Sequence, residues 1–394
     1  MAREKAVAGP IRGNRKGGIV PGQLSRPIPL VRECCYTSRC QSTLVRRTLH
    51  QESPQARFSD IQLGGNILEM DAATKSIELH PSGPPRRLVR PDGFKTSSIS
   101  VGISGDAIRL LANEGSADAL VARVEQPGWA SFPKTHTDSE YSSIVSVSRL
   151  SESRETRLFG LTATFPKIEM LPDGEILVVA SRCFRNPDGS HEMNAKVYGA
   201  DGKQNREFLL GDGINHIQTD AEGRIWVGYF DEGIFGNFGW QYAGGPFGAA
   251  GLSCFAKSGQ KMWDYEPPEG FDHIADCYAL NVSSSGVWSH YYTDFPIARV
   301  DSDWHVRCWN TELSGGRTFA VGDDKVLLYG GYGDRCTACN LLSLEDRDAR
   351  LVAEVSLVLP REIDLTKDTV IGRDKGLHVF LGDDWYLFSI DSLD

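Results

Sequence analysis

The sequence predicts an all-β fold, a six-bladed β-propeller over residues 58–394 that is closed by an N-terminal strand and preceded by a basic arm, residues 1–57. Three observations support this prediction. A unit of short strands recurs at intervals typical of propeller blades, the chain ends one strand short of a complete unit, and an extended segment precedes the first complete unit.

The arm and the propeller region carry opposite net charges. Residues 1–57 hold 11 Lys and Arg against 3 Asp and Glu, whereas residues 58–394 hold 31 against 49. Because the acidic region repels phosphates, we expect no nucleic acid ligand for the propeller. The arm has too little apolar periodicity to join a core, so we expect it to be disordered.

The apolar pattern also bears on the location of the protein. No apolar run approaches the roughly 20 residues that a membrane-spanning helix needs, so we expect no transmembrane segment. Residues 1–15 lack the apolar stretch of a secretory signal. We therefore expect a cytoplasmic protein, or an organelle-targeted one if the Arg-rich, acid-poor arm is a transit peptide.

Residues 214–229 are the clearest example of the repeated unit. They contain a short strand, a turn at Asp220 to Gly223, and a second strand of β-branched and aromatic residues. This segment resembles the repeat of NHL-type and two-component-regulator propellers and, more loosely, that of the gluconolactonase-like six-bladed group. The resemblance implies a propeller blade.

The same unit recurs along the chain, with turn residues 38 to 69 positions apart. The turn residues are Gly105, Gly174, Gly223, Gly286, Asp324 and Gly376. Apolar second strands follow at 107–111, 176–180, 225–229, 287–291, 326–329 and 377–381. In four units a third strand and a polar turn lead to a fourth strand, at 206–210, 261–265, 305–309 and 350–355. Such meanders have bare edges and an unburied face, so radial stacking is their stable arrangement.

The two ends of the propeller region predict how the ring closes. The last unit stops shortly after residues 386–391, before a fourth strand could form. We expect residues 76–80 to supply that strand. The alternative is a seven-bladed ring, in which residues 67–71 and 76–80 form a hairpin of an extra blade.

Propeller geometry predicts where a binding site lies. First strands begin and second strands end on one face, around the mouth of the central channel. The residues expected at the second-strand ends are Asn113, Arg182, Asp231, Asp294, Tyr332 and Asp384. Units three and four repeat a Trp-containing strand followed by Tyr and Asp. The predicted ligand-binding residues are Arg182, His216, Asp231, Glu232, His273, Asp276, His290, Tyr292 and Asp294.

This set of imidazoles and carboxylates suits either a divalent cation or acid–base chemistry. The gluconolactonase-like resemblance implies a metal held by a Glu, an Asn and an Asp, for which Asn215 and either Asp276 or Asp294 are candidates. The Glu-Gly-Pro motif that this group carries in its first blade is missing. The glycine- and aromatic-rich segment 236–248 is expected to overhang the same mouth as a lid or partner-binding loop.

Two function classes follow. The favoured hypothesis is a non-enzymatic propeller that binds a protein or small molecule at its channel mouth. The alternative is a metal-dependent lactonase- or esterase-like hydrolase at the same site, with a divalent cation as its cofactor.

Cys336 and Cys339 form a single CxxC pair, which we expect to be reduced thiols. A zinc site would need further ligands from Cys34, Cys35 and Cys40.

Overall fold

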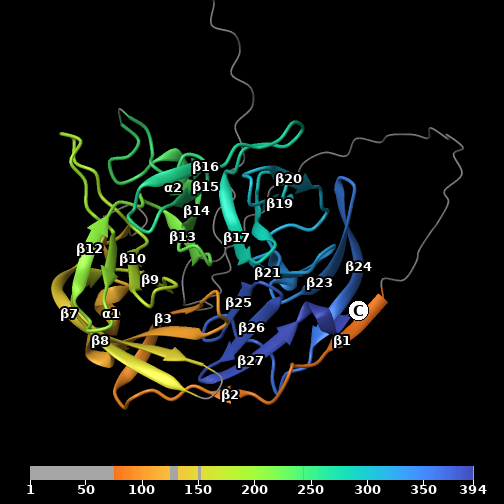
Figure 1. Cartoon of the computed structure of the whole chain (residues 1–394), viewed down its shortest axis with the longest axis horizontal. Helices are drawn as coiled ribbons and strands as arrows, with labels where there is room; N and C mark the ends of the chain where they lie inside the picture. Colours follow the sequence, from red (N-terminus) through yellow and green to blue (C-terminus); the bar gives the residue numbers. More distant parts are fainter. Residues whose placement is uncertain (1–74, 125–131, 150–151, 243, 394) are drawn as a thin grey trace, which may run out of the picture. The chain divides into compact units, whose positions relative to one another are not determined.

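The computed structural model describes residues 75–124, 132–149, 152–242 and 244–393. Strands dominate this part of the chain, and they form six sheets of four or five strands around a central axis (Figure 1). The predicted six-bladed propeller is confirmed. No helix in the described ranges is long and apolar enough to cross a membrane.

Each blade is an antiparallel meander that we number in chain order. Blade 1 contains β3 (Phe94–Val101), β4 (Ala107–Asn113), β7 (His136–Ser148) and β8 (Ser153–Ala163). Blade 2 contains β9 (Pro166–Met170), β10 (Ile176–Ala180), β11 (Ala195–Tyr198) and β12 (Gln204–Phe208). Blade 3 contains β13 (Ile214–Thr219), β14 (Ile225–Tyr229), β15 (Leu252–Phe255) and β16 (Lys261–Asp264).

Blade 4 contains β17 (Asp276–Ser283), β18 (Gly286–Tyr292), β19 (Ile297–Val300) and β20 (Val306–Trp309). Blade 5 contains β21 (Thr318–Val321), β22 (Lys325–Tyr329), β23 (Cys339–Glu345) and β24 (Asp348–Leu357). Blade 6 contains β25 (Thr369–Arg373), β26 (Gly376–Leu381) and β27 (Asp384–Ser389). Short elements decorate the loops: α1 (Glu114–Leu120), β5 (Arg123–Val124), β6 (Phe132–Pro133), α2 (Asp231–Phe235), η1 (Gly333–Arg335) and η2 (Ile390–Leu393).

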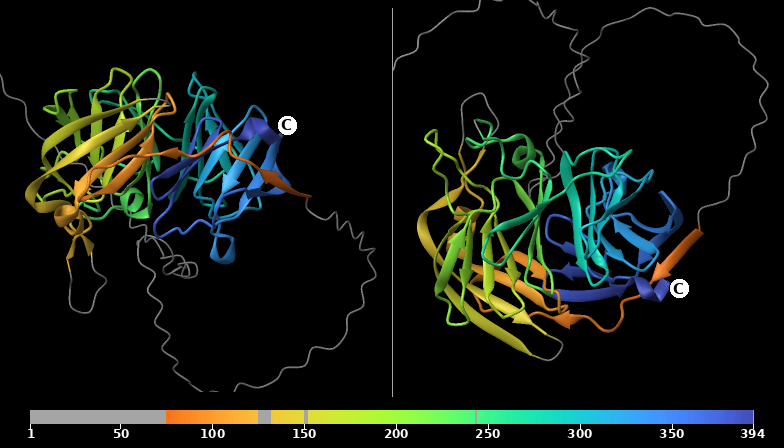
Figure 2. Two further views of the ribbon diagram at one scale, coloured as in Figure 1. Left: turned by 90° about the horizontal axis from the view of Figure 1, so that it is seen from below. Right: turned by 45° about the horizontal axis from the view of Figure 1, so that its top comes forward.

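The first strand of every blade is innermost, and it runs from what we call the upper face to the lower face (Figures 1 and 2). The upper face therefore carries the starts of the first strands and the ends of the second strands. The lower face carries the hairpin turns between first and second strands. Four of these turns have glycine at positive φ, at Gly105, Gly174, Gly223 and Gly286, where a side chain would be strained.

The ring closes through an N-terminal strand, but the strand differs from the one we predicted. The fourth strand of blade 6 is β2 (Arg86–Arg87), which pairs antiparallel with β27 through Arg86 with Trp385 and Arg87 with Asp384. The predicted segment instead forms β1 (Lys75–Leu79), a parallel fifth strand on β24 of blade 5 (Figure 1).

The packing explains this correction. Leu79 is buried in the core cluster that contains Ala353 and Val355 of β24, so the apolar side of β1 is matched to the outer edge of blade 5. The closing strand has only two residues, both arginine, and therefore no apolar pattern. The seven-bladed alternative is wrong because β1 adds to blade 5; residues 67–71 lie outside the described ranges.

Blades 3 and 4 pack closely because β14 has a glycine, Gly228, where a side chain would collide with blade 4. All five residues of β14 are buried, and Trp226 and Tyr229 join a core cluster with Leu280 and Tyr291 of blade 4. A Cβ atom at Gly228 would lie 2.6 Å from the Sγ atom of Cys277. This contact brings the starts of β13 and β17 side by side at the upper face.

Candidate functional site

An acidic and aromatic cluster occupies the upper face over blades 3, 4 and 5. We call it the mouth cluster and define it as Asp231, Asp276, Tyr278, Tyr292, Phe295 and Tyr332. Asp276 is the first residue of β17 and pairs with Tyr292, the last residue of β18. Phe295 follows in the β18–β19 hairpin at a φ of 54°. Tyr332 comes from the loop after β22 of the next blade.

Phe295 contacts each of the other three rings of the mouth cluster. The centroid of Phe295 lies 5.2 Å from that of Tyr278, 5.6 Å from that of Tyr292 and 5.8 Å from that of Tyr332. The hydroxyl groups of Tyr278 and Tyr332 are 2.5 Å apart and joined by a hydrogen bond. Tyr292 and Tyr332 remain 45% and 46% exposed, so two of the four rings are partly open to solvent.

The carboxyl group of Asp276 is the electrostatically unusual member of the cluster. Its Oδ1 atom is buried and has no hydrogen-bond partner among the described residues. Burial, followed by the negative charge of Asp231, raises the pKa of Asp276 to about 7. Enclosure of the Asp231 carboxyl also raises its own pKa, although that residue as a whole is exposed. Both carboxyl groups beside the rings are therefore protonated more easily than an ordinary aspartate.

The predicted residues at the start of β13 serve to join blades 3 and 4. Nε2 of His216 lies 3.0 Å from the carbonyl oxygen of Tyr278, and Nδ2 of Asn215 donates to the carbonyl of Cys277 at 2.9 Å. Burial and then the positive charge of Lys167 lower the pKa of His216 to about 3. His216 is therefore neutral at physiological pH, with a proton on Nε2 for this bond.

Arg182 and Glu232 belong to a separate ionic cluster between blades 2 and 3. Arg182 is buried and donates to both carboxylate oxygens of Asp212, at 3.0 and 2.9 Å. Its Nη2 atom is also 2.5 Å from Glu232, whose carboxylate accepts a bond from Asn237 at 2.7 Å. Burial raises the pKa of Asp212 to about 6, while Arg182 opposes the rise. Arg182 and Glu232 are thus engaged in holding loops.

The glycine- and aromatic-rich segment is fastened to blade 2 in the structure. Trp240 is buried, and its indole donates to the carbonyl of Cys183 at 2.8 Å. The carbonyl of Phe238 accepts a bond from the backbone of Arg185. Gly239 approaches the Arg185 carbonyl so closely that a Cβ atom would clash at 1.9 Å. The segment therefore packs against the loop after β10 of blade 2, with Tyr242 exposed; its role as a lid or partner-binding loop stays a prediction.

The remaining predicted residues divide between the blade interior and exposed loops. His290 is fully buried on β18, where its Nδ1 atom lies 3.2 Å from the carbonyl of Pro296. Burial lowers the pKa of His290 to about 4. His273 is exposed ahead of β17, and Asp294 is exposed in a turn at a φ of 59°. His216 and His290 are thus engaged by backbone carbonyls, and the ligand-binding role of the three histidines stays a prediction.

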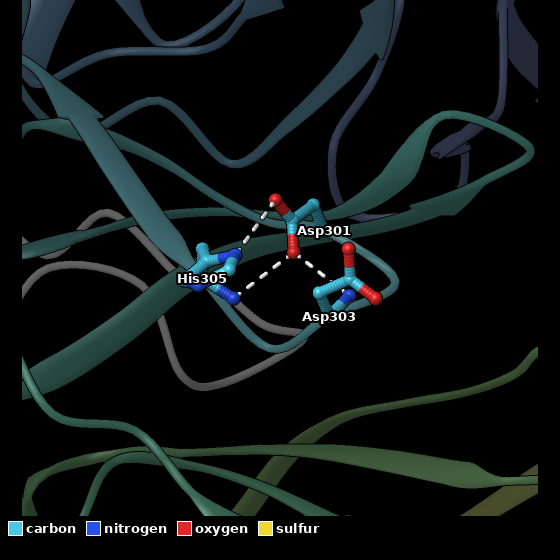
Figure 3. A group of neighbouring side chains, drawn as sticks. All are labelled: Asp301, Asp303 and His305. Atoms are coloured by element: carbon cyan, nitrogen blue, oxygen red, sulfur yellow. Dashed lines mark hydrogen bonds and ion pairs between the residues drawn. The ribbon is translucent and has the colours of Figure 1, made fainter.

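A possible set of metal ligands lies on the lower face. Within the described ranges, Asp301, Asp303 and His305 form the single group of His, Cys, Asp and Glu with ligand atoms within 4.8 Å (Figure 3). Oδ1 of Asp301 accepts the backbone N–H groups of Asp303 and His305, both at 2.9 Å, which lowers the pKa of Asp301. These bonds close the β19–β20 hairpin and account for the grouping as a turn.

Two amides and an arginine that the sequence did not reveal cross the channel below the mouth. Gln218 of blade 3 accepts from the backbone of Val282 at 2.7 Å and from Arg373 of blade 6 at 2.8 Å. Asn281 of blade 4 donates to the carbonyl of Phe319 in blade 5 at 2.6 Å. These bonds link the inner strands of blades 3 to 6. The signal for them is weak, because isolated amides in strands have many uses.

The cysteines of the described ranges are all free thiols. Cys339 is buried on β23, and burial raises the pKa of its thiol. Cys336 is partly exposed. The arm cysteines that a zinc site would need lie outside the described residues.

Comparisons with known proteins give a partial family match and distant structural similarity. Residues 246–343 match the YxzG family, which is less than half of the chain. No curated protein matches the sequence. A catalytically inactive variant of virginiamycin B lyase from Staphylococcus aureus, with quinupristin, is 10% identical at a TM-score of 0.40; the match covers 78% of this chain and 98% of the lyase.

Two further structures have comparable similarity. A gluconolactonase from Xanthomonas campestris is 13% identical at a TM-score of 0.34, over 79% of this chain and 97% of its own. Sqt1 from Saccharomyces cerevisiae is 11% identical at a TM-score of 0.38, over 80% and 95% of the two chains. Similarity at this level does not distinguish an enzyme from a binding protein.

Proposed function

We propose that this protein is a non-enzymatic binding propeller whose mouth cluster holds a cationic group of a protein or small-molecule ligand. One observation carries the proposal. The buried Oδ1 atom of Asp276 has no hydrogen-bond partner among the described residues, and it lies in a cluster whose other members are Asp231 and four aromatic rings. A buried acceptor without a donor is costly, and an ammonium or guanidinium group would supply the missing donor.

The aromatic members of the cluster favour an organic cation. The faces of tyrosine and phenylalanine rings attract cations, most strongly where water is excluded. Tyr292 and Tyr332 are about half exposed, so their rings can close around a ligand that reaches Asp276. Lysine or arginine side chains of a partner protein and small organic amines share this chemistry.

The hydrolase alternative rests on the same pair of carboxyl groups. Asp231 and Asp276 are close enough for the charge of one to raise the pKa of the other. A carboxyl group with a pKa of about 7 is suited to act as a general base near neutral pH. A divalent cation between the two groups would relieve their repulsion and could polarise a lactone or ester carbonyl.

A binding measurement on the full chain tests the proposal. The probes are a hexalysine peptide and n-butylammonium, titrated by calorimetry against sodium chloride of equal ionic strength. We expect both probes to bind, and we expect Asp276→Asn and Tyr332→Leu each to weaken binding about tenfold or more. Asp294→Asn is the matched control, because Asp294 is an exposed carboxylate of the same face and its positive φ suits asparagine.

The outcomes separate the two functions. Equal binding by the wild type, Asp276→Asn and Asp294→Asn would contradict a cation site in the mouth cluster. Calcium or manganese that raises the melting temperature of the wild type alone, together with lactone or ester turnover lost in Asp276→Asn, would favour the hydrolase instead.

A further inference from the structure

A hollow of about 810 Å³ lies between blade 6 and blade 1 and reaches the turns of the lower face. We call it the seam hollow, because the first and last blades of the ring meet here. Its walls include the β3–β4 turn, the β25–β26 turn and the closing strand β2. Four of its lining residues are Arg86, Arg373, Lys375 and His378.

Arg86 and Arg373 bring two guanidinium groups to this hollow. Arg86 lies on β2 with its guanidinium 4.7 Å from the ring centroid of Trp385, and no carboxylate within the described ranges forms an ion pair with it. Arg373 is 2% exposed; its Nη1 donates to Gln218 at 2.8 Å and its Nη2 to the carbonyl of Thr219. Nε of Arg373 is buried and has no acceptor in the described part of the chain.

His378 adds a neutral donor. The indole of Trp385 donates to Nδ1 of His378 at 3.1 Å, so the proton of the neutral imidazole is on Nε2. Burial, followed by the positive charges of Arg373 and Arg86, lowers the pKa of His378 to about 3. The imidazole is thus an uncharged N–H donor in a positively charged surrounding.

The acidic residues of the hollow are largely engaged elsewhere. Asp106 forms an ion pair with Arg149 at 2.9 Å. Asp374 accepts bonds from the backbone and the hydroxyl of Ser284, both at 3.2 Å. Lys375, for its part, is paired with Asp391 at 3.1 Å. Glu152 is the exposed carboxylate on the wall that would oppose an anion.

We propose that the seam hollow binds a small oxyanion, the phosphate or carboxylate group of a metabolite, with Arg86 and His378 as donors and Arg373 as a fixed positive charge at its wall. The oxyanion would accept from Arg86 of the closing strand β2 and from His378 of β26, and so would link two strands of blade 6. The site is independent of the mouth cluster, since it lies between different blades and selects ligands of opposite charge.

The test uses the full chain and measures its melting temperature with inorganic phosphate and with citrate, against sodium chloride of equal ionic strength. We expect phosphate, citrate or both to raise the melting temperature by about 2–4 °C at saturation, because a ligand that binds only the folded state stabilises it. Arg86→Gln should weaken the apparent affinity at least tenfold. Glu152→Gln should tighten it, since it removes the opposing charge.

Arg87→Gln is the matched control. Arg87 is the neighbouring arginine of the same two-residue strand, but it pairs with Asp384 at 3.0 Å and does not line the hollow. Its variant should keep the full response to the anion. A response to phosphate alone or citrate alone supports the site and assigns the oxyanion. The proposal is overturned if neither anion exceeds the salt control, or if Arg86→Gln and Arg87→Gln respond equally.

Discussion

The mouth cluster and the seam hollow both lie where blades meet, but they offer opposite charges to a ligand. Both lie between blades, and each contains a buried polar atom without a partner among the described residues, Oδ1 of Asp276 in one and Nε of Arg373 in the other. The mouth surrounds an acceptor with aromatic rings, whereas the hollow surrounds a donor with further cations. On the two proposals above, local donors and acceptors, and not the acidic net charge, would determine which ligand each site favours.

The largest expected effect concerns β2, the two-residue strand that closes the ring and lines the seam hollow. Removing residues 1–90 deletes β2 together with the bond from Arg90 to Asp383, leaving the β27 edge unpaired. Removing residues 1–80 deletes only β1 from the outside of blade 5. We expect the longer deletion to lower the melting temperature by roughly 10 °C or more, or to cause aggregation, and the shorter one to cost much less.

Calorimetry of the two truncations checks this ranking, and removal of residues 1–57 is the control that should change nothing. Equal destabilisation by the deletions of 1–80 and 1–90 would show that β1, and not β2, holds the ring closed.

The second prediction removes the buried cation of the hollow. Arg373→Met should lower the free energy of unfolding by about 3 kcal/mol, because the Thr219 carbonyl loses the Arg373 donor and Gln218 loses one of its two donors. The variant would also remove a charge that lowers the pKa of nearby Glu169, which burial has already raised to about 7. Urea denaturation measures the change. A loss below about 1 kcal/mol would indicate that the channel network contributes little.

The third prediction concerns the pH dependence of the mouth. The pKa of Asp276 is about 7 when folded and near 4 when unfolded, so the folded state binds the proton more tightly. Its contribution to stability is therefore present at low pH and is lost as the pH rises from about 4 to about 7. We expect Asp276→Asn to be more stable than the wild type at pH 8 by on the order of 1 kcal/mol or more, with a smaller gain at pH 5.

Denaturation curves at the two pH values, with Asp294→Asn beside them, check the third prediction. A gain that is the same at both pH values would mean that the Asp276 carboxyl is not protonated in the folded state near neutral pH.

Blade 3 shows what the sequence could predict. The strand 225–229 was located to the residue, because β-branched and aromatic residues follow a glycine turn and are buried on both faces. Blade 1 shows the limit. Its outermost strand β8 was not predicted, since a long polar strand at a blade edge carries little apolar pattern. The closing strand was missed for the same reason. The third strand of blade 1, β7, of which the second half is buried, and the helix α1 were not predicted either.

For the candidate site, the sequence predicted the positions of some residues at the mouth but not the contacts that these residues make. Asp276 and Tyr292 were placed at the mouth because strand ends meet there, but Tyr278 and Phe295 were not named. Their contact lies within blade 4 and depends on the positive φ of Phe295, while Tyr332 reaches them from blade 5. His290 was expected at the mouth, yet β18 is buried over most of its length, and the side chain lies inside blade 4. Local sequence patterns do not encode such contacts between segments that the fold brings together.

The smallest expected effect separates the mouth from the acidic turn of the lower face. Asp301→Asn should shift the melting temperature by no more than about 1–2 °C, because the asparagine Oδ1 atom can accept the same two backbone N–H groups. Calcium or manganese should have the same effect on this variant and the wild type, since the turn is satisfied by its own bonds. A metal-dependent rise in melting temperature that Asp301→Asn abolishes and Asp276→Asn keeps would contradict this expectation. The divalent site would then lie at the lower face, and the mouth would be left to organic cations alone.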